Sequence, residues 1–492
     1  MRTGGQYTAS LRDDRAIFVD GERVRDVTQH EAFRGVVSTV ASLYDIASDP
    51  ANEMSFTEPE TGMVANKMFL IPRNVADLRA RRAAIERWSR ATNGFLGRGP
   101  DHVAAFLAGF ASAPVLFDRG RAGFGEHVTE FYRRACREDL YLSYVIVPPQ
   151  VDRSKTAQGQ EEAFLQVGVL RERDDGIVVR GAQMLGTAAA LSDFVFVSCI
   201  VPQRPGDEDY ALSFIAPLAS PGLRLYPRRP YAMGQPSTFD YPLSTRFDES
   251  DALIVFDDVF IPWEHVFVYR NVDLTRSQFF ETAAHVLGNT QAQIRLSVKL
   301  QFLVGVARKI AATNRIDGFP QVQETLADLA AIAAIVEGMV LAAEASSSID
   351  AYGVARPNPR FLYAAMSQQA EFYPRALHLL RQLAGGGVMQ LPSSAAAELN
   401  NPETGPDIRR YIRSTGVPSE ERIKLFKLAW DLFGSEFGGR HHQYEMFYAG
   451  APYVAKGYAF RNYGYEEALT LVDAFLDGYG VDTPAPGALQ EA

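Results

Sequence analysis

Two side chains that could do chemistry together lie in the segment GRGPDH, residues 97–102. Arg98 carries a permanent positive charge, and His102 can gain or lose a proton near neutral pH. They are four residues apart, and a helix that begins near Pro100 would let both reach a pocket at its mouth. The alternative is a surface turn in which Asp101 caps the helix.

A second candidate lies in LYLSYVIVPPQVDRSK, residues 140–155. The apolar run ends abruptly at Pro148 and Pro149, and hydrogen-bonding side chains follow, among them Gln150 and Arg153. A tight turn that packs its backbone against a ligand would need this arrangement. A loop that links two domains would also fit the pattern.

His441 and Glu445 fall one turn apart on a predicted helix and could touch one metal ion. A third ligand is not evident, so a polar cluster on a helix face is favoured and no metal site is predicted. The sequence contains no glycine-rich phosphate loop, no C-x-x-C, no H-E-x-x-H and no G-x-S-x-G. A nicotinamide-binding domain is therefore not expected.

Bulk composition is that of a globular protein: 492 residues, 47% apolar, 22% charged, with a net charge of −10. The basic residues are scattered, which argues against a nucleic acid partner. Two isolated cysteines, Cys136 and Cys199, fit a reducing compartment rather than a disulfide scaffold. We find no signal peptide and no apolar run of about 18 residues. These features predict a soluble cytoplasmic protein that does not bind membranes.

The hydrophobic periodicity of the elements that must position these residues changes along the chain. This change predicts an α+β protein with three domains. Residues 1–143 are mostly helical, residues 144–272 form short strands without intervening helices, and residues 273–492 are helical again. The strands predict an antiparallel sheet or a barrel, and the long final helices predict a bundle that also serves as an oligomer interface. The last ten residues, TPAPGALQEA, are typical of a disordered tail. The helices and strands expected from the pattern are 31–48, 74–92, 100–113, 176–185, 194–201, 210–218, 252–263, 282–314, 320–348, 359–383 and 419–442.

Several long stretches together resemble one family. They are GRGPDH (97–102), PPQVDRS (148–154), GAQMLGTAAALSD (181–193), FDYPLSTRFDESDALIVFDDVFIPWEHVFVY (239–269) and RIKLFKLAWDLFGSEFGGRHHQYE (422–445). The chain is similar, from about Arg2 to Gly480, to the oxygenase component of the two-component flavin monooxygenases typified by 4-hydroxyphenylacetate 3-hydroxylase. Members of that family attack phenol, nitrophenols, chlorophenols and resorcinol.

The resemblance implies an acyl-CoA-dehydrogenase-like fold with an N-terminal helical domain, a middle β-barrel and a C-terminal four-helix bundle, assembled as a homotetramer. It also implies FAD that arrives as FADH2 from a separate NADH-dependent flavin reductase, with O2 as co-substrate. The flavin C4a-hydroperoxide would then hydroxylate a phenol, mainly ortho to its hydroxyl. In this family the PPQVDRS turn lies against the flavin, so the resemblance favours the ligand turn. Gln150 and Arg153 would address the flavin, and the hydroxyl of Thr187 would meet the same ring.

The resemblance assigns Arg98 to stabilise the phenolate. Here the sequence departs from the 4-hydroxyphenylacetate pattern, in which Tyr follows this Arg by four residues and His precedes the two prolines. His102 and Tyr144 have exchanged those types, so His102 could act as base or hydrogen-bond partner opposite Tyr144. They could also simply line a pocket of different polarity. Relatives that act on chlorophenols have a His where our alignment places Gln291, with Asn289 nearby.

This exchange favours a small phenolic substrate such as phenol, 4-nitrophenol or resorcinol. The alternatives are a 4-hydroxyphenylacetate 3-hydroxylase, a chlorophenol monooxygenase and, more remotely, a non-catalytic flavin-binding protein. A flavin-dependent dehydratase with an iron–sulfur cluster would need cysteine and histidine ligands, which two distant cysteines cannot supply.

Overall fold

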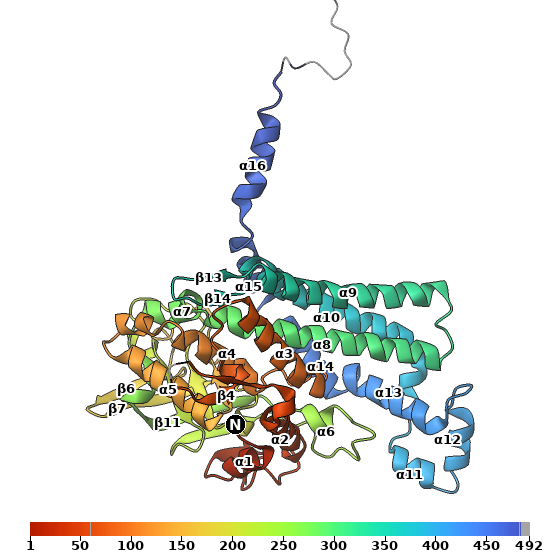
Figure 1. Cartoon of the computed structure of the whole chain (residues 1–492). Helices are drawn as coiled ribbons and strands as arrows, with labels where there is room; N and C mark the ends of the chain where they lie inside the picture. Colours follow the sequence, from red (N-terminus) through yellow and green to blue (C-terminus); the bar gives the residue numbers. More distant parts are fainter. Residues whose placement is uncertain (60, 482, 484–492) are drawn as a thin grey trace, which may run out of the picture.

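The computed structural model describes residues 1–59, 61–481 and 483, and it follows the predicted order of helices, strands and helices (Figure 1). From residue 484 on, the predicted C-terminal tail lies outside the described residues. The α+β class and the predicted order of N-terminal helices, middle strands and C-terminal helices are confirmed.

The N-terminal region is built around α4, nearly all of whose residues are buried. Pro100 occupies the first turn of this helix, where its missing N–H costs nothing. The preceding helix, α3, is capped by Asn74, whose side chain accepts a hydrogen bond from the Asp77 N–H. The helices of this region are α1 Gly4–Ser10, α2 Arg34–Ser48, α3 Val75–Ala91, α4 Pro100–Ala111 and α5 Phe124–Glu138, and a hairpin joins β3 Ser55–Thr57 to β4 Val64–Asn66.

Two sheets form the β region and share one hydrophobic core with the N-terminal helices. The larger has the order β2-β1-β10-β11-β7-β6, and the smaller has the order β12-β9-β8-β5. Their strands are β1 Ala16–Val19, β2 Glu22–Val24, β5 Leu142–Val145, β6 Gly168–Arg173, β7 Gly176–Gln183, β8 Phe194–Val197, β9 Ser213–Pro217, β10 Leu223–Pro227, β11 Ala252–Pro262 and β12 Val266–Val268.

The sequence pattern suggested antiparallel strands throughout, but two strand pairs are parallel. β1 pairs with β10 and β5 pairs with β8 in parallel, while the other neighbours in these two sheets are antiparallel. Parallel partners need a long connection between them, and both pairs are separated by long stretches of chain. The hairpin β1–β2 thereby adds an N-terminal segment to the edge of the larger sheet.

The C-terminal region is a bundle around α8, α9, α10 and α13, with a core of its own. The remaining helices extend it or connect it to the sheets. The bounds are α6 Ser244–Phe247, α7 Val272–Glu281, α8 Ala284–Thr313, α9 Pro320–Ala345, α10 Pro359–Ala384, α11 Ala395–Asn400, α12 Gly405–Tyr411, α13 Ser419–Phe433, α14 Glu436–Met446, α15 Pro452–Arg461 and α16 Tyr465–Leu476, with a small hairpin of β13 Ser348–Ile349 and β14 Ala355–Arg356.

The helix predicted over 419–442 is two helices, because the chain breaks at Gly434. A Cβ added there would lie 2.4 Å from Cε3 of Trp430, so only glycine allows this close approach. Ser435 then starts α14 by accepting a hydrogen bond from the Gly438 N–H at 3.1 Å. The break gives α14 its own direction, which matters for the site below.

Helix α9 is long and apolar enough, by length and composition, to cross a membrane, contrary to the expectation from apolar runs. A core helix of a bundle passes the same test, so this single helix is weak evidence for a span. Ile332, Val336 and Val340 on one side of α9 are buried against the bundle, and a third of the most apolar stretch is buried in all.

Candidate active site

The turn between α3 and α4 presents Arg98, and other regions of the chain hold its backbone. The Arg98 N–H donates to Oε2 of Glu249 at 2.8 Å, and its carbonyl accepts from the Tyr141 hydroxyl at 2.6 Å. Glu249 precedes β11, and Tyr141 lies at the start of β5. Two contacts from the sheets therefore fix the turn against the start of α4, and Arg98 remains partly accessible.

Three tyrosine rings face the Arg98 guanidinium. Its central carbon lies 5.1 Å from the ring centre of Tyr144, 4.8 Å from Tyr448 and 5.4 Å from Tyr444. Cation–π contacts of this kind hold a charge in place without neutralising it. The sequence predicted Tyr144, but Tyr444 and Tyr448 were missed, although HHQYE was one of the resembling motifs.

His102 lies fully buried beneath Arg98, so the surface-turn alternative is wrong. Its Nε2 is in short contact with Nη1 of Arg98, and its ring stacks on Tyr144 with centres 5.5 Å apart. Burial, and then the Arg98 charge, hold the pKa of His102 well below its usual value. The ring is therefore neutral at physiological pH.

The other ring nitrogen of His102, Nδ1, lies 2.9 Å from Oε1 of Gln291 on α8. The Gln291 side-chain nitrogen donates in turn to Oδ1 of Asp101 at 3.0 Å. Burial raises the pKa of Asp101 to about 6. The residue aligned with the chlorophenol-type histidine thus contacts His102 directly, whereas Asn289 hydrogen-bonds to the carbonyl of His285 at 2.7 Å.

Thr187 lies in a tight loop after β7 in which Leu185 and Ala188 have positive φ angles of 63° and 61°. Its hydroxyl donates to Oδ1 of Asp251 at 2.6 Å. A Cβ added to Gly186 would lie 3.2 Å from Cγ1 of Val145, so the loop packs directly on β5, the strand that carries Tyr144.

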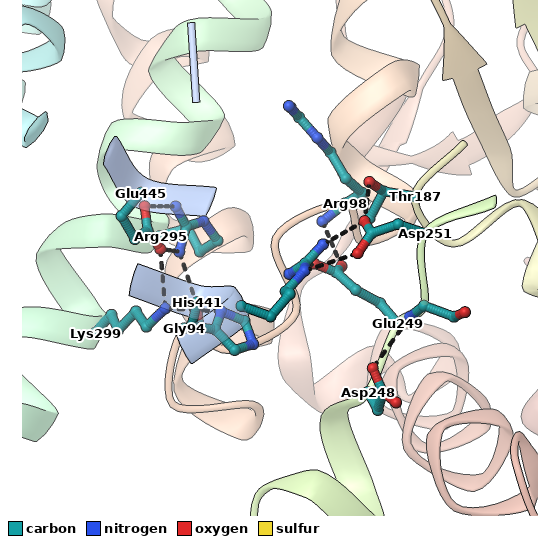
Figure 2. Close-up of polar contacts among 12 residues, drawn as sticks. Gly94, Arg98, Thr187, Asp248, Glu249, Asp251, Arg295, Lys299, His441 and Glu445 are labelled. Carbon is teal, nitrogen blue, oxygen red and sulfur yellow. Dashed lines mark hydrogen bonds and ion pairs between the residues drawn. The ribbon is translucent and has the colours of Figure 1, made fainter. Parts of the chain in front are cut away.

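Arg440 on α14 connects the Arg98 turn to the Thr187 loop. Its guanidinium donates to both oxygens of Asp251, at 2.7 and 3.0 Å, and to Oε1 of Glu249 at 2.9 Å. Figure 2 shows Arg98, Thr187, Glu249 and Asp251 close to one another. Burial alone would raise the pKa of Asp251, but Arg440 and then Arg228 hold it well below its usual value. We call Arg98, Glu249, Asp251 and Arg440 the turn cluster.

Gln150 and Arg153 are not brought into contact with the turn cluster. Both are exposed, and Gln150 folds back to donate to the Pro148 carbonyl at 3.0 Å. Asp152 pairs with Lys155 at 3.5 Å, and Arg153 makes no ion pair in the described part of the chain. Their assignment to the flavin stays a prediction.

Two glutamine side chains near this turn have hydrogen-bond acceptors that are unused in the described part of the chain. Gln160 donates to the Asp152 carbonyl, and Gln183, at the end of β7, donates to the Ser198 carbonyl. The side-chain oxygens of both glutamines are buried without a hydrogen-bond partner among the described residues. Buried polar atoms are rarely left unpaired, so a ligand that donates hydrogen bonds suits this region.

His441 and Glu445 take part in a second buried cluster within the bundle. Glu445 accepts from Arg295 at 2.7 and 2.8 Å and from Lys299 at 2.9 Å, and Lys299 lies 3.0 Å from Nδ1 of His441. We call Arg295, Lys299, His441 and Glu445 the bundle cluster. The Glu445 carboxylate also accepts from the Gln369 amide at 2.6 Å. No group of three candidate ligands able to hold a metal ion occurs among the described residues.

Comparison with known proteins covers nearly the whole chain. The family model described as 4-hydroxyphenylacetate 3-hydroxylase N terminal matches residues 3–268, and the one described as its C terminal matches residues 275–477. The 4-hydroxyphenylacetate 3-monooxygenase oxygenase component of Pseudomonas aeruginosa is 38% identical over 459 residues, 91% of this chain and 86% of that protein.

Two further relatives are similar over comparable lengths. The pyoverdin chromophore biosynthetic protein PvcC of Pseudomonas aeruginosa is 36% identical over 453 residues, covering 92% of this chain and 89% of that protein. A crystal structure of the oxygenase component of 4-hydroxyphenylacetate 3-monooxygenase complexed with FAD and 4-hydroxyphenylacetate is 33% identical. It superposes with a TM-score of 0.92 over 97% of this chain and 99% of that chain.

Proposed function

Since the chain belongs to the 4-hydroxyphenylacetate 3-hydroxylase family, we propose that it hydroxylates a phenol of the 4-hydroxyphenylacetate type next to the phenolic hydroxyl. It is the oxygenase component of a two-component, FAD-dependent monooxygenase that uses O2. The observation that carries the substrate proposal is Arg98, a partly accessible cation held among three tyrosine rings.

When bound, FAD delivered in reduced form by a separate flavin reductase would supply the chemistry that activates O2, and the oxygen atom added to the ring would come from that O2. We propose that Thr187, Gln150 and Arg153 hold it. The Thr187 hydroxyl already donates its hydrogen to Asp251, so its oxygen can only accept a hydrogen bond from the ligand. Gln150 and Arg153 are free to donate from the exposed turn.

Arg98 is the group that activates the substrate. A phenol has a pKa of about 10 in water, and a neighbouring cation lowers that value by roughly 1–3 units. The negative charge that develops on the phenol oxygen would therefore be stabilised beside Arg98. Because His102 is buried next to the same cation, its imidazole stays neutral. It therefore serves as a hydrogen-bond partner and does not keep the proton of the phenol.

Two substrate classes fit the site to different degrees. The characterised relatives support a substrate that carries a para side chain, as 4-hydroxyphenylacetate does. The exchange of residue types between His102 and Tyr144 instead favours small phenols such as phenol, 4-nitrophenol and resorcinol. The relatives are the stronger support, so the small phenols are our second candidate.

Turnover measurements separate these classes. The enzyme is supplied with FAD, NADH and a flavin reductase, and each of 4-hydroxyphenylacetate, phenol, 4-nitrophenol and resorcinol is offered in turn. We expect the ortho-hydroxylated product of 4-hydroxyphenylacetate, identified by mass spectrometry, at the highest kcat/KM. Preference for a small phenol would move the assignment to the second candidate. Flavin binding without product from any phenol would indicate the non-catalytic alternative.

We also propose that the enzyme assembles with further copies of itself, as a homotetramer. Figure 1 shows α16 standing clear of the rest of the fold, and its apolar side chains Leu471 and Phe475 are 72% and 71% exposed. The outer face of α9 likewise exposes Ile335 and Leu341. Both apolar surfaces lack a partner among the described residues, and a second copy could cover them.

Light scattering on the wild type and on a double variant, Leu471→Glu with Phe475→Glu, tests this assembly. We expect a tetramer for the wild type and smaller species for the variant. A monomeric wild type would contradict it.

The reduced thiols of Cys136 and Cys199 and the need for NADH support a cytoplasmic location.

A further inference from the structure

The amide of Gln291 forms a bridge between two buried groups of α4. Its nitrogen donates to Asp101 at 3.0 Å, and its oxygen lies 2.9 Å from Nδ1 of His102. Asp101, His102 and Gln291 are 5%, 0% and 1% exposed, so water does not compete for these contacts. This bridge crosses from α4 to α8, between residues about 190 positions apart in the chain.

The bridge has only one consistent direction. Above its pKa of about 6, Asp101 is ionised and only accepts hydrogen bonds, so at neutral pH it must face the amide NH2 of Gln291. The amide oxygen therefore faces His102 and requires a hydrogen on Nδ1. In a neutral imidazole only one nitrogen carries hydrogen, which leaves Nε2 as an acceptor.

The contact at Nε2, on the other side of the ring, independently requires the same tautomer. Nε2 is in short contact with Nη1 of Arg98, and a guanidinium can only donate. Two neighbours on opposite sides thus select the same tautomer. Tyr144 and Phe106 pack on the ring, with centres 5.5 and 5.3 Å away, and fix its plane.

We propose that Gln291 is a positioning residue that holds His102 in the neutral tautomer with hydrogen on Nδ1, so that Nε2 points at Arg98 and the phenol. This rests on the proposed function, because it assigns the acceptor nitrogen to the substrate side. With substrate bound, Nε2 accepts a hydrogen bond from the phenolic hydroxyl or from Arg98. The hydroxyl and the guanidinium are then held side by side.

A neutral amide suits this task better than a carboxylate. The charged groups around His102 are Arg98 on one side, Asp101 behind Gln291, and the more distant Arg295. A carboxylate at position 291 would attract a second proton to the imidazole, which would place two cations side by side and remove the acceptor at Nε2. The amide orients the ring without adding charge.

Nitrogen NMR of the ligand-free protein, with ¹⁵N-labelled histidine, tests the tautomer without turnover. The His102 signals are assigned by their loss in His102→Asn. We expect an Nδ1 with attached hydrogen and an unprotonated Nε2 between pH 7 and 8, where Asp101 is ionised. In Gln291→Leu this preference should weaken, because only the Arg98 contact at Nε2 then selects the tautomer. The opposite tautomer in the wild type, or an unchanged one in Gln291→Leu, would overturn the proposal.

Turnover of the same proteins gives the functional test. We expect Gln291→Leu to bind FAD as the wild type does but to lose about tenfold in product per NADH, with hydrogen peroxide released instead. Gln291→Glu should show product yield that falls as the pH is lowered, because the introduced carboxylate raises the pKa of His102. Gln293→Leu, a matched buried change on α8 whose side chain contacts Gln369, is the control and should keep the wild-type yield.

The outcomes distinguish the two proposals. Wild-type protein that hydroxylates none of the phenols contradicts the proposed function, whatever the NMR result. Wild-type turnover with an unaffected Gln291→Leu contradicts the positioning role alone. Equal losses in both Gln291 variants, with an unshifted pH profile, would indicate a purely structural role and would also overturn it. If Gln291→Leu does not fold, the wild-type NMR signals and Gln291→Glu still decide.

Discussion

The turn cluster and the bundle cluster, several members of which are labelled in Figure 2, each place an arginine against the Tyr444 ring. They differ in whether every cation has a carboxylate partner. In the bundle cluster, Glu445 is fully buried and neutralised by Arg295 and Lys299. In the turn cluster, Arg440 neutralises two carboxylates, but the Arg98 guanidinium faces tyrosine rings and His102, with no acidic side chain bonded to it among the described residues.

The difference shows how one set of residue types supports two purposes. A cation paired with a carboxylate has little charge to offer a ligand, so the bundle cluster only fixes α14 against α8. Arg98 keeps its charge available because aromatic rings hold it in place. Tyr444 faces both clusters, with Arg440 at 4.7 Å and Arg295 at 5.5 Å from its ring centre. We expect perturbation of the bundle cluster to change stability and perturbation of Arg98 to change chemistry.

The largest effect is expected from Glu445→Gln. Removing this charge leaves Arg295 and Lys299 buried without a counterion, which should lower the free energy of unfolding by about 3–5 kcal/mol. Chemical denaturation monitored by circular dichroism measures it. A loss below about 1 kcal/mol would show that the bundle cluster does not contribute as a buried ion network. Glu371→Gln, which removes an exposed ion pair with Lys456, is the control.

Next in size is Arg98→Ala. We expect the ratio of hydroxylated product to NADH to fall at least about a hundredfold, with hydrogen peroxide as the main product and FAD binding retained. Because the Arg98 side chain forms no ion pair with a described residue, the free energy of unfolding should change little. Near-normal product yield would refute the assigned role. This variant and Glu445→Gln should therefore show opposite profiles.

The pH dependence of folding stability should differ between Glu445 in the bundle cluster and Asp101 on α4. Burial favours a raised pKa for Glu445, but Arg295 and Lys299 lower it to about 2. Its folded-state pKa is below the unfolded value, so its stabilisation is present above about pH 4.5 and lost as the pH falls through 2, on the order of 3 kcal/mol in all. Asp101, raised to about 6 by burial, has the opposite sign. It stabilises the fold below about pH 4, and that contribution is lost as the pH rises through 6.

Denaturant titrations between pH 3 and 7 measure both contributions. Glu445→Gln should remove the loss at the acid end, and Asp101→Asn should remove the decline toward pH 6. Identical pH dependence in the wild type and both variants would contradict the two assigned pKa shifts.

A smaller effect is expected from Arg440→Lys. Lysine keeps the charge but cannot bond both oxygens of Asp251 and also Glu249. We expect a loss of about 1–2 kcal/mol in unfolding free energy and a few-fold loss of product yield, because the Thr187 loop and the Arg98 turn are no longer held together. Wild-type yield would show that this connection is dispensable. Lys456→Arg, at an exposed pair, serves as the control.

The smallest effects are expected from two buried tyrosine side chains. Tyr444 and Tyr373 each have a buried hydroxyl without a partner among the described residues, one beside Arg98 and the other beside Lys299. Replacing either by Phe should change the free energy of unfolding by less than about 0.5 kcal/mol. Only Tyr444→Phe should alter KM for the phenol. A change of KM in Tyr373→Phe would remove the functional distinction between the clusters.

The sequence by itself determined the elements and the local parts of the site. Hydrophobic periodicity and caps are encoded within a few residues, so the helices at 74–92 and 100–113 and the strand at 252–263 were predicted nearly to their ends. The spacing of Arg98 and His102 at one helix start was also readable, and the long resembling motifs pointed to the family. The break at Gly434 was missed because its cause, a contact with the Trp430 ring, is steric rather than periodic.

Only the tertiary structure decided what surrounds those residues. Gln291 contacts His102 across 189 positions, and Arg440 contacts Glu249 across 191. No local pattern encodes such pairs, because any buried polar residue can find its partner anywhere in the chain. The sequence therefore supplied a cation and an imidazole at one helix start. Packing of the bundle and the sheets against α4 determined that the cation has no carboxylate partner in the described part of the chain and that the imidazole stays neutral.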